Sequence, residues 1–393
     1  HLKMSLDATV IVIDRKKQEM ITPVNLKAVT EVICQEKNKG VIDKDHVLYH
    51  PRVAVLGDSH GKGEPPVKDA LSICTGDYMD PKAGFIGLDP KGAILDPQRF
   101  KESQRKWIES IKSGEAKYIL GNHDVAFLSA MLVSPDKAND WYETHEGRKI
   151  CAVYNIATPA PPINKDNWNS FKDAILNASD KTLFHFYETL LTHGQLYAVV
   201  NETYMSHTLP LTNKDGSLFE ISVRGQKLSG MKLLDFFENN LRELGKAKVT
   251  GVIEPQTYAN AINALKILNS GYYPQTDIHT PLWVRDEPVQ NVMLNADVAT
   301  RLITDLDAQG KRKGTRVKRV LYGHVQGSGS TDETKNIVNI DYSGRLFPPG
   351  MQKDLYALLT VTSDSSRNGK VTLEHCEPEG ISFNSIKSTY SLN

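Results

Sequence analysis

The sequence predicts an α/β fold in which short apolar strands alternate with amphipathic helices. Between residues 52 and 124, three apolar runs are interrupted by a helical pattern, and each run ends in glycine and polar residues. Such alternation is typical of βαβ units, which place their strands parallel in a sheet. With 393 residues and 40% hydrophobic content, the chain can bury a large core. We therefore predict a single domain over 1–393, with a core over about 5–194 and 275–365 and a helical insertion or cap over about 195–275.

In the first half of the chain, local sequence patterns predict the following strands and helices. Apolar runs predict strands at 8–14, 52–58, 71–74 and 116–120, the last leading into a polar loop. A helix is predicted over 25–40, closed by Gly40. A second is predicted over 99–114, because Phe100, Trp107, Ile108 and Ile111 recur at helical spacing before Gly114. These predicted strands and helices alternate as they do in βαβ units.

The second half begins with a proline-rich connection at 157–168, followed by an amphipathic run at 181–194. Two helical stretches at 230–245 and 257–271 suggest the insertion, which we interpret as a cap on the domain. The sheet is expected to resume at 315–327 and to continue with strands at 337–344 and 355–363.

Composition limits the range of partners. Lysine plus arginine and aspartate plus glutamate both number 47, so the overall charge gives no reason to expect nucleic acid. No apolar run approaches the roughly 18 residues needed for a membrane span. Four cysteines lie far apart without Cys-x-x-Cys spacing, which favours a reducing, cytoplasmic compartment. The sequence does not indicate an oligomeric state.

Side chains of the kinds that bind metal ions follow the predicted strands. Each strand or helix runs into a glycine-rich motif: "GDSHG" with Asp58 and His60, "GDYMD" with Asp77 and Asp80, "GNHD" with Asn122 and His123, and "GHVQ" with His324 and Gln326. A fifth candidate, His193, follows the helical run at 181–194. Taken singly, each motif is compatible with ordinary turn chemistry. Their repetition favours a metal site where strand ends meet.

In the order of these motifs, the chain resembles the calcineurin-like metallophosphoesterases, and within them the phosphoprotein phosphatase (PPP) family. The resemblance runs from about residue 52 to 343 and is that of a divergent, bacterial-type member. It implies a metallophosphoesterase-type β-sandwich flanked by helices. It also implies a PPP-like catalytic domain that carries two divalent metal ions.

The resemblance implies a role for each motif. Asp58 and His60 would bind the first ion, Asp77 would bridge, and Asn122, His193 and His324 would bind the second. Mixed oxygen and nitrogen ligands suit Mn²⁺, our first expectation, or Fe or Zn²⁺. Whether Gln326 adds to the first ion stays open.

Two further residues match the catalytic acid of the family. His123 would protonate the leaving oxygen, and Asp80 would orient that imidazole. The implied reaction is direct attack by a metal-bridging hydroxide, without a phosphoenzyme.

The chain departs from the family at two phosphate-binding positions. Pro81 and Lys82 follow "GDYMD" where signalling members have Arg-Gly, and Leu120 stands where they have arginine. Arg285, in "TPLWVRDEP", is the candidate replacement, because a guanidinium can bind phosphate through two hydrogen bonds. Alternatively, Trp283 packs in the core and Arg285 pairs with a neighbouring carboxylate.

The leading functional hypothesis is a phosphomonoesterase acting on phosphoproteins, at Ser/Thr, with Tyr also open. One alternative is a dinucleoside-polyphosphate or nucleotide hydrolase, since "LGNHD" resembles bacterial enzymes of that kind. Another is a catalytically weak metal-binding interaction module, suggested by the missing arginines. The atypical insertions are also compatible with a bacterial protein delivered into a host cell.

Overall fold

The computed structural model describes residues 45–48, 50, 52–57, 65–68, 70–80, 97–223, 226–274, 276, 278–284, 294–324 and 336–339, together with strand backbone at 356–362, 370–376 and 386–391. The strand predicted at 8–14 and the helix predicted at 25–40 lie outside these residues.

The first of two large sheets contains the strands that carry the N-terminal motifs. Its order is β13–β12–β11–β2–β3–β4. Strands β2 (Arg52–Leu56), β3 (Leu71–Cys74) and β4 (Ala116–Tyr118) run parallel, as predicted. The other strands of this sheet pair antiparallel: β11 (Tyr356–Thr362) with β2, and β12 (Lys370–Cys376) with β11 and β13 (Ile386–Ser391). The sheet is therefore mixed.

The second sheet collects strands from distant parts of the chain. Its order is β1–β5–β6–β9–β10, and its bounds are β1 (Val47–Leu48), β5 (Tyr197–Val200), β6 (Thr203–Ser206), β9 (Arg319–Tyr322) and β10 (Ile337–Asn339). Strand β6 pairs parallel with β9. The residues that follow these two strands therefore emerge at the same edge of the sheet.

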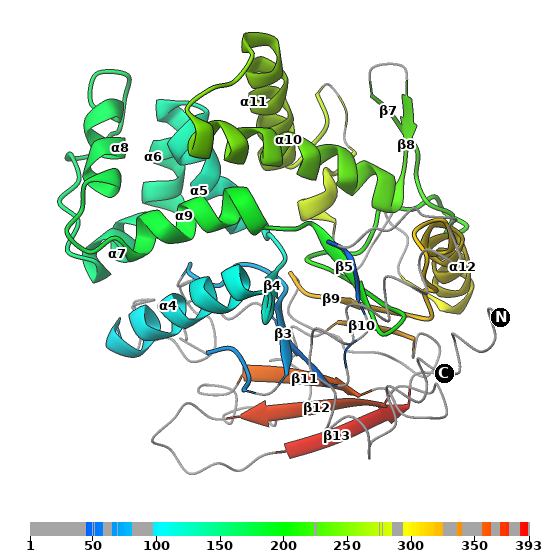
Figure 1. The fold of residues 1–393 in the computed structure, drawn as a ribbon. Coiled ribbons are helices and arrows are strands. Elements are labelled where there is room, and N and C mark those ends of the chain that lie inside the picture. The colour runs from blue at the N-terminus through cyan, green and yellow to red at the C-terminus, as the bar shows by residue number, and fades with distance from the viewer. Residues whose placement is uncertain are drawn as a thin grey trace.

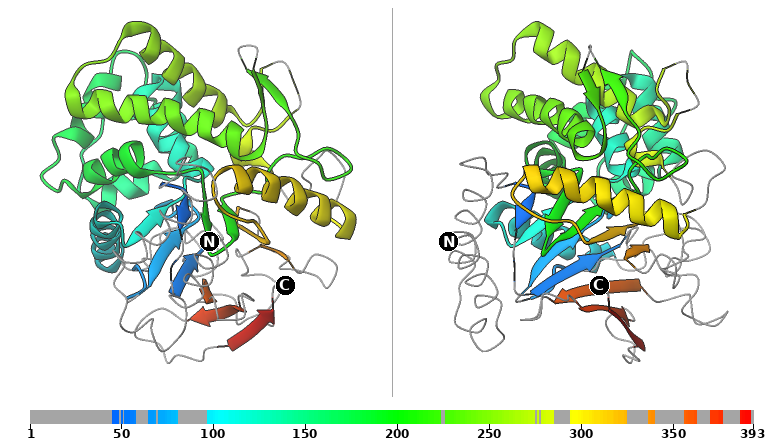
Figure 2. Two further views of the ribbon diagram at one scale, coloured as in Figure 1. Left: turned by 45° about the vertical axis from the view of Figure 1, so that its right-hand side comes forward. Right: turned by 90° about the vertical axis from the view of Figure 1, so that its right-hand side faces the viewer.

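Helices gather mainly on one side of the two sheets (Figures 1 and 2). Helix α4 (Pro97–Ser113) packs on β4 and on α9 (Thr182–His193) through Phe100, Trp107 and their neighbours. Helix α12 (Ala296–Arg312) begins where the Asn295 side chain accepts a hydrogen bond from Val298 N–H. The α/β fold predicted from the sequence is confirmed.

Four helices replace the polar loop predicted after β4. They are α5 (Asn122–Leu132), α6 (Pro135–Thr144), α7 (Gly147–Val153) and α8 (Trp168–Leu176). Helix α5 is apolar on almost every face, and Val125 to Met131 are all buried. Because a helix buried all round has no polar stripe, its sequence lacks the amphipathic pattern by which helices are recognised.

The region predicted as an insertion over 195–275 is only partly helical. Residues 197–200 and 203–206 are strands β5 and β6 of the second sheet, and a small hairpin, β7 (Ile221–Val223) and β8 (Gln226–Leu228), follows. Helices α10 (Gly230–Thr250) and α11 (Pro255–Ser270) then pack against each other and against α9 and α5. A short turn of 3₁₀ helix, η1 (Pro281–Trp283), leads back toward the sheets. No helix within the described residues is long and apolar enough to cross a membrane.

Candidate metal centre

Asp77 lies in a loop that comes directly after β3. The residue is 1% exposed and has a φ of 53°, a left-handed conformation that is uncommon outside glycine. Such backbone strain persists only where the surrounding structure holds it in place. The loop therefore places this carboxylate in a defined position at the edge of the sheet.

The loop after β3 and the loop before α5 approach so closely that both require glycine. A Cβ atom on Gly121 would lie 2.1 Å from Asp77 Oδ1, and one on Gly76 would lie 2.5 Å from Gly121 N. The Asp77 Oδ1 atom instead accepts a hydrogen bond from His123 N–H at 2.9 Å. The two motif loops therefore form one tightly packed unit.

Asp124 joins these two loops, although the motif order gives it no role. Its Oδ2 accepts hydrogen bonds from Gly121 N–H at 2.8 Å and Asp77 N–H at 3.0 Å. Its Oδ1 accepts a third from the Tyr118 hydroxyl at 2.9 Å. Burial, followed by the nearby Asp77 charge, raises the pKa of Asp124 to about 7.

We expect Asp124→Ala to destabilise the fold by about 3 kcal/mol or more, because three buried donors lose their acceptor at roughly 1–3 kcal/mol each. Asp124→Asn should cost less, since an amide oxygen can still accept from the two N–H groups. Urea unfolding in the presence of a chelator measures both variants without a metal contribution. Tyr118→Phe is the comparison variant: it removes the hydroxyl that donates to Asp124 and accepts from Tyr78 N–H, but it keeps both bonds by which Asp124 joins the two loops. Equal stability of Asp124→Ala and wild type would contradict this anchoring role.

His207 comes directly after β6 and is completely buried. Its Nδ1 lies 2.7 Å from the Thr75 carbonyl oxygen, which only accepts, so Nδ1–H donates there. Burial lowers the pKa of His207 and favours the neutral ring, despite the opposing Asp77 charge. The Nε2 lone pair then faces Asn122 Oδ1 at 3.0 Å and Asp77 Oδ2 at 3.4 Å.

Three lone-pair donors, from Asp77, Asn122 and His207, thus face one another. A cation between them would remove their mutual repulsion, and a histidine that donates its other N–H to a backbone carbonyl is typical of metal ligands. The donor set of carboxylate, amide oxygen and imidazole suits a divalent ion.

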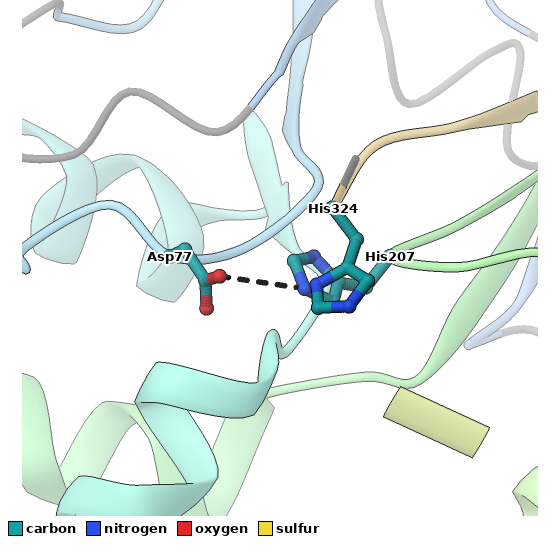
Figure 3. Close-up of side chains that lie close together, drawn as sticks. All are labelled: Asp77, His207 and His324. Atoms are coloured by element: carbon teal, nitrogen blue, oxygen red, sulfur yellow. Dashed lines mark ion pairs between the residues drawn. The ribbon is translucent and has the colours of Figure 1, made fainter. Parts of the chain in front are cut away.

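His324 completes this group from the loop after β9. Its ring centroid lies 5.0 Å from that of His207, and the backbone N–H of Gly323 donates to the His207 carbonyl at 2.9 Å. His324 also has a left-handed φ, of 71°. Three ligand atoms lie within 4.8 Å of one another, one each from Asp77, His207 and His324. Figure 3 shows the three side chains together.

The predicted acid pair lies beside this group. His123 Nδ1 forms a very short contact with Asp80 Oδ2, and His123 Nε2 is 3.9 Å from Asp77 Oδ2. Asp80 is 2% exposed; burial raises its pKa, and the His123 charge opposes that shift. Through its Nδ1, His123 is therefore held by the carboxylate that the family resemblance pairs with it.

The structure does not bring His193 to this group. It is the last residue of α9, and its Nδ1 lies 2.8 Å from the Thr192 hydroxyl oxygen. Burial and the positive charges of Arg242, Lys112 and Lys117 lower its pKa, and the same charges would repel a metal ion. His207, and not His193, is grouped with Asp77 and His324.

The sequence contains a signal for His207 that the motif order does not use. His207 follows the short strand run "TYMS", just as Asp77 and His324 follow theirs. The motif order favours His193 because "HG" matches the family motif. The remaining predicted residues, Asp58, His60 and Arg285, lie outside the described residues, as do Lys82 and Gln326.

Comparison with known proteins found one family model, described as Firmicute fructose-1,6-bisphosphatase, which matches residues 169–256. This segment is less than a quarter of the chain and includes His207. A search of curated proteins returned no match.

A solved structure, described as a protein serine/threonine phosphatase from Saccharomyces cerevisiae with similarity to human phosphatase PP5, is similar over 93% of this chain and 89% of that one. The identity is 12% and the TM-score is 0.34, so this likeness carries no argument about function. The match to a phosphatase family and the grouped ligand side chains together indicate a metal-dependent phosphatase.

Proposed function

We propose that the protein is a metal-dependent phosphomonoesterase that acts on a sugar bisphosphate. The observation that carries the proposal is the convergence of Asp77, Asn122 and His207, whose ligand atoms face one another at 3.0–3.4 Å around the His207 Nε2 lone pair. Such a buried arrangement of acceptors is costly unless a cation joins them. The bisphosphate substrate is supported by the partial match to the Firmicute fructose-1,6-bisphosphatase family.

The residues that would bind the ions follow from this geometry and from the motif order. Asp77, Asn122, His207 and His324 would hold one ion, with His207 in the role that the motif order gives to His193. Asp58 and His60 would hold the other together with Asp77. Two divalent ions, for which Mn²⁺ remains our expectation, would neutralise the phosphate and acidify a water molecule.

The chain's own residues would control the proton and the position of the ester. His123 would donate a proton to the leaving alkoxide, which is a poor leaving group without one. Asp80 would hold the His123 ring through Nδ1 so that Nε2 faces the substrate. Arg285 remains our candidate for binding phosphate oxygens.

Phosphoprotein hydrolysis, the leading prediction from the motif order, remains the second candidate. Nucleotide hydrolysis and a weakly active binding module follow it. All four share the same metal ligands and differ in which ester, if any, is hydrolysed, so a single substrate panel separates them.

The test removes metal with a chelator, restores Mn²⁺ and compares five substrates: fructose 1,6-bisphosphate, a phosphopeptide mixture, a dinucleoside tetraphosphate, p-nitrophenyl phosphate and its bis-ester. We expect Mn²⁺-dependent release of phosphate from the bisphosphate and from p-nitrophenyl phosphate, but not from the bis-ester. Asp77→Asn is the inactive control. If the phosphopeptides or the dinucleotide are hydrolysed faster than the bisphosphate, the proposed substrate is wrong. If no ester is hydrolysed, the proposal that the protein is an enzyme is wrong.

A further inference from the structure

A second imidazole lies against His123 and has no part in the proposed reaction. His145 follows α6 directly, and its ring meets that of His123 edge to face, with centroids 4.9 Å apart and planes at 87°. One nitrogen from each ring and one oxygen of Asp80 lie within 4.8 Å of one another. Two imidazoles and a carboxylate therefore lie close enough together to be ligands of one metal ion.

The backbone around His145 holds this arrangement in place. The His145 N–H donates to Trp141 O at 3.1 Å, and Glu146 follows with a left-handed φ of 63°, which ends the helix. Trp141, only 1% exposed, packs on Phe127 of α5 with ring centroids 4.7 Å apart. Because α5 also carries His123, the two histidines belong to one packed helix pair.

Asp140 supports His145 from the solvent side. His145 Nε2 lies 3.5 Å from Asp140 Oδ2, and hydrogen bonding to His145 lowers the pKa of Asp140, so this carboxylate is ionised at neutral pH. The side chain of Asp140 is 47% exposed, whereas that of His145 is 16% exposed. An imidazole that directs one N–H to a carboxylate can bind a metal ion through its other nitrogen, which is the usual outer-sphere arrangement of zinc histidines.

We infer that Asp80, His123 and His145 form a separate binding site for a transition metal ion of the zinc class, and that occupation of this site inhibits the enzyme. The inhibitory role rests on the proposed function. Zn²⁺ commonly uses three protein ligands of this kind plus water. Zn–N bonds of about 2.0–2.1 Å place ligand atoms roughly 3.4 Å apart. Side-chain rotation would therefore have to separate Asp80 Oδ2 from His123 Nδ1, which are now in short contact, so that the ion can lie between them.

Inhibition follows from the chemistry of His123. An ion bound at Nε2 would take the lone pair that must carry the catalytic proton, and an ion bound at Nδ1 would replace the Asp80 contact that directs Nε2 toward the ester. His123 would then be unable to protonate a leaving alkoxide. Excess zinc should therefore stop turnover even when the ions that bind the phosphate are in place.

A third group of potential ligands differs from the Asp80 group in the contacts that its carboxylates already make. It consists of His46, Asp235 and Glu238. Asp235 already binds a cation, Lys313 Nζ, at 2.8 Å. The Glu238 oxygens contact His46 Nε2 at 2.6 Å and Leu196 N–H at 2.8 Å. This group is an internal ion-pair network, because a lysine ammonium and a backbone N–H, which a metal ion would have to displace, already bind its carboxylates.

The first experiment titrates Zn²⁺ into the Mn²⁺-loaded protein and follows p-nitrophenyl phosphate and fructose 1,6-bisphosphate. His145→Gln should keep the basal turnover and raise the zinc concentration for half inhibition by at least about tenfold, the loss typical of altered metal sites. Asp140→Asn should shift it in the same direction by a smaller factor. His185→Gln, the same change at a histidine whose side chain is 48% exposed on α9, is the matched control and should leave inhibition unchanged.

The second experiment measures binding without turnover. Equilibrium dialysis against Zn²⁺ should give one fewer ion per chain in His145→Gln than in wild type or His185→Gln. An unchanged zinc count, or unchanged inhibition in both His145→Gln and Asp140→Asn, would overturn the site. If the wild type hydrolyses no ester, the inhibitory role falls with the proposed function, while the zinc count still decides whether the site exists.

Discussion

Replacing His207 with Gln is expected to lower Mn²⁺-dependent turnover by about 10³-fold or more, because a metal ligand contributes several kcal/mol to transition-state stabilisation. The structure supports this through the contacts of His207 Nε2 with Asn122 and Asp77. His193→Gln is the matched control and should retain activity, since that residue lies at the end of α9 among positive charges. Turnover of p-nitrophenyl phosphate and elemental analysis of bound manganese check both variants.

The metal content of these two variants also decides whether His207 or His193 is the metal ligand. Loss of bound manganese in His193→Gln, with normal metal content in His207→Gln, would restore the assignment made from motif order. Because His207 is buried, thermal unfolding of the chelated proteins should accompany the assay. Equal stability without metal, but unequal stabilisation by Mn²⁺, would separate a ligand from a packing residue.

His123→Gln is expected to have an effect that depends on the leaving group. Turnover of a sugar phosphate should fall by about 10²- to 10⁴-fold, the usual contribution of a general acid. Turnover of p-nitrophenyl phosphate should fall far less, because nitrophenolate leaves without needing a proton. Steady-state kinetics on the two substrates, compared as a ratio, measures the effect.

Asp80→Asn tests the same pair from its other side. The Asp80 contact with His123 Nδ1 orients the ring, so this variant should show the same dependence on leaving group with a smaller loss. An equal loss on both substrates in His123→Gln would exclude a proton donor and would point to a role in binding the phosphate.

Local pattern predicted the parallel part of the fold well. The strands β2, β3 and β4 and the helix α4 all appear where apolar runs and helical spacing placed them. Their signals lie within single segments, since each buries either a continuous run or one clear face. Strand β11 was also expected, but its antiparallel pairing with β2 depends on contacts more than 300 residues apart in sequence.

The elements that pattern missed are those buried on all sides or joined to distant strands. Helix α5 has no polar stripe, so it gave no amphipathic signal. Strands β5 and β6 were assigned to an insertion, although they form the middle of the second sheet. A short apolar segment can be strand, helix or loop, and only its neighbours in space decide.

In the candidate site, too, some residues could be predicted from the sequence and others could not. Motif order led directly to Asp77, Asn122, His123, Asp80 and His324, which the structure brings into one region. The role of Asp124 could not be inferred from its position, because its acceptor bonds join two loops. His145 is likewise visible only once α5 and α6 pack together.

The sequence by itself determined the chemical class of the site, because ligand types after apolar strands depend only on local order along the chain. The tertiary structure decided which histidine, His207 or His193, joins Asp77 and His324. The parallel pairing of β6 with β9 carries His207 and His324 to one sheet edge, while α9 ends elsewhere. Motif spacing cannot reveal that choice, since hydrogen bonding between strands remote in sequence selects the side chains that meet.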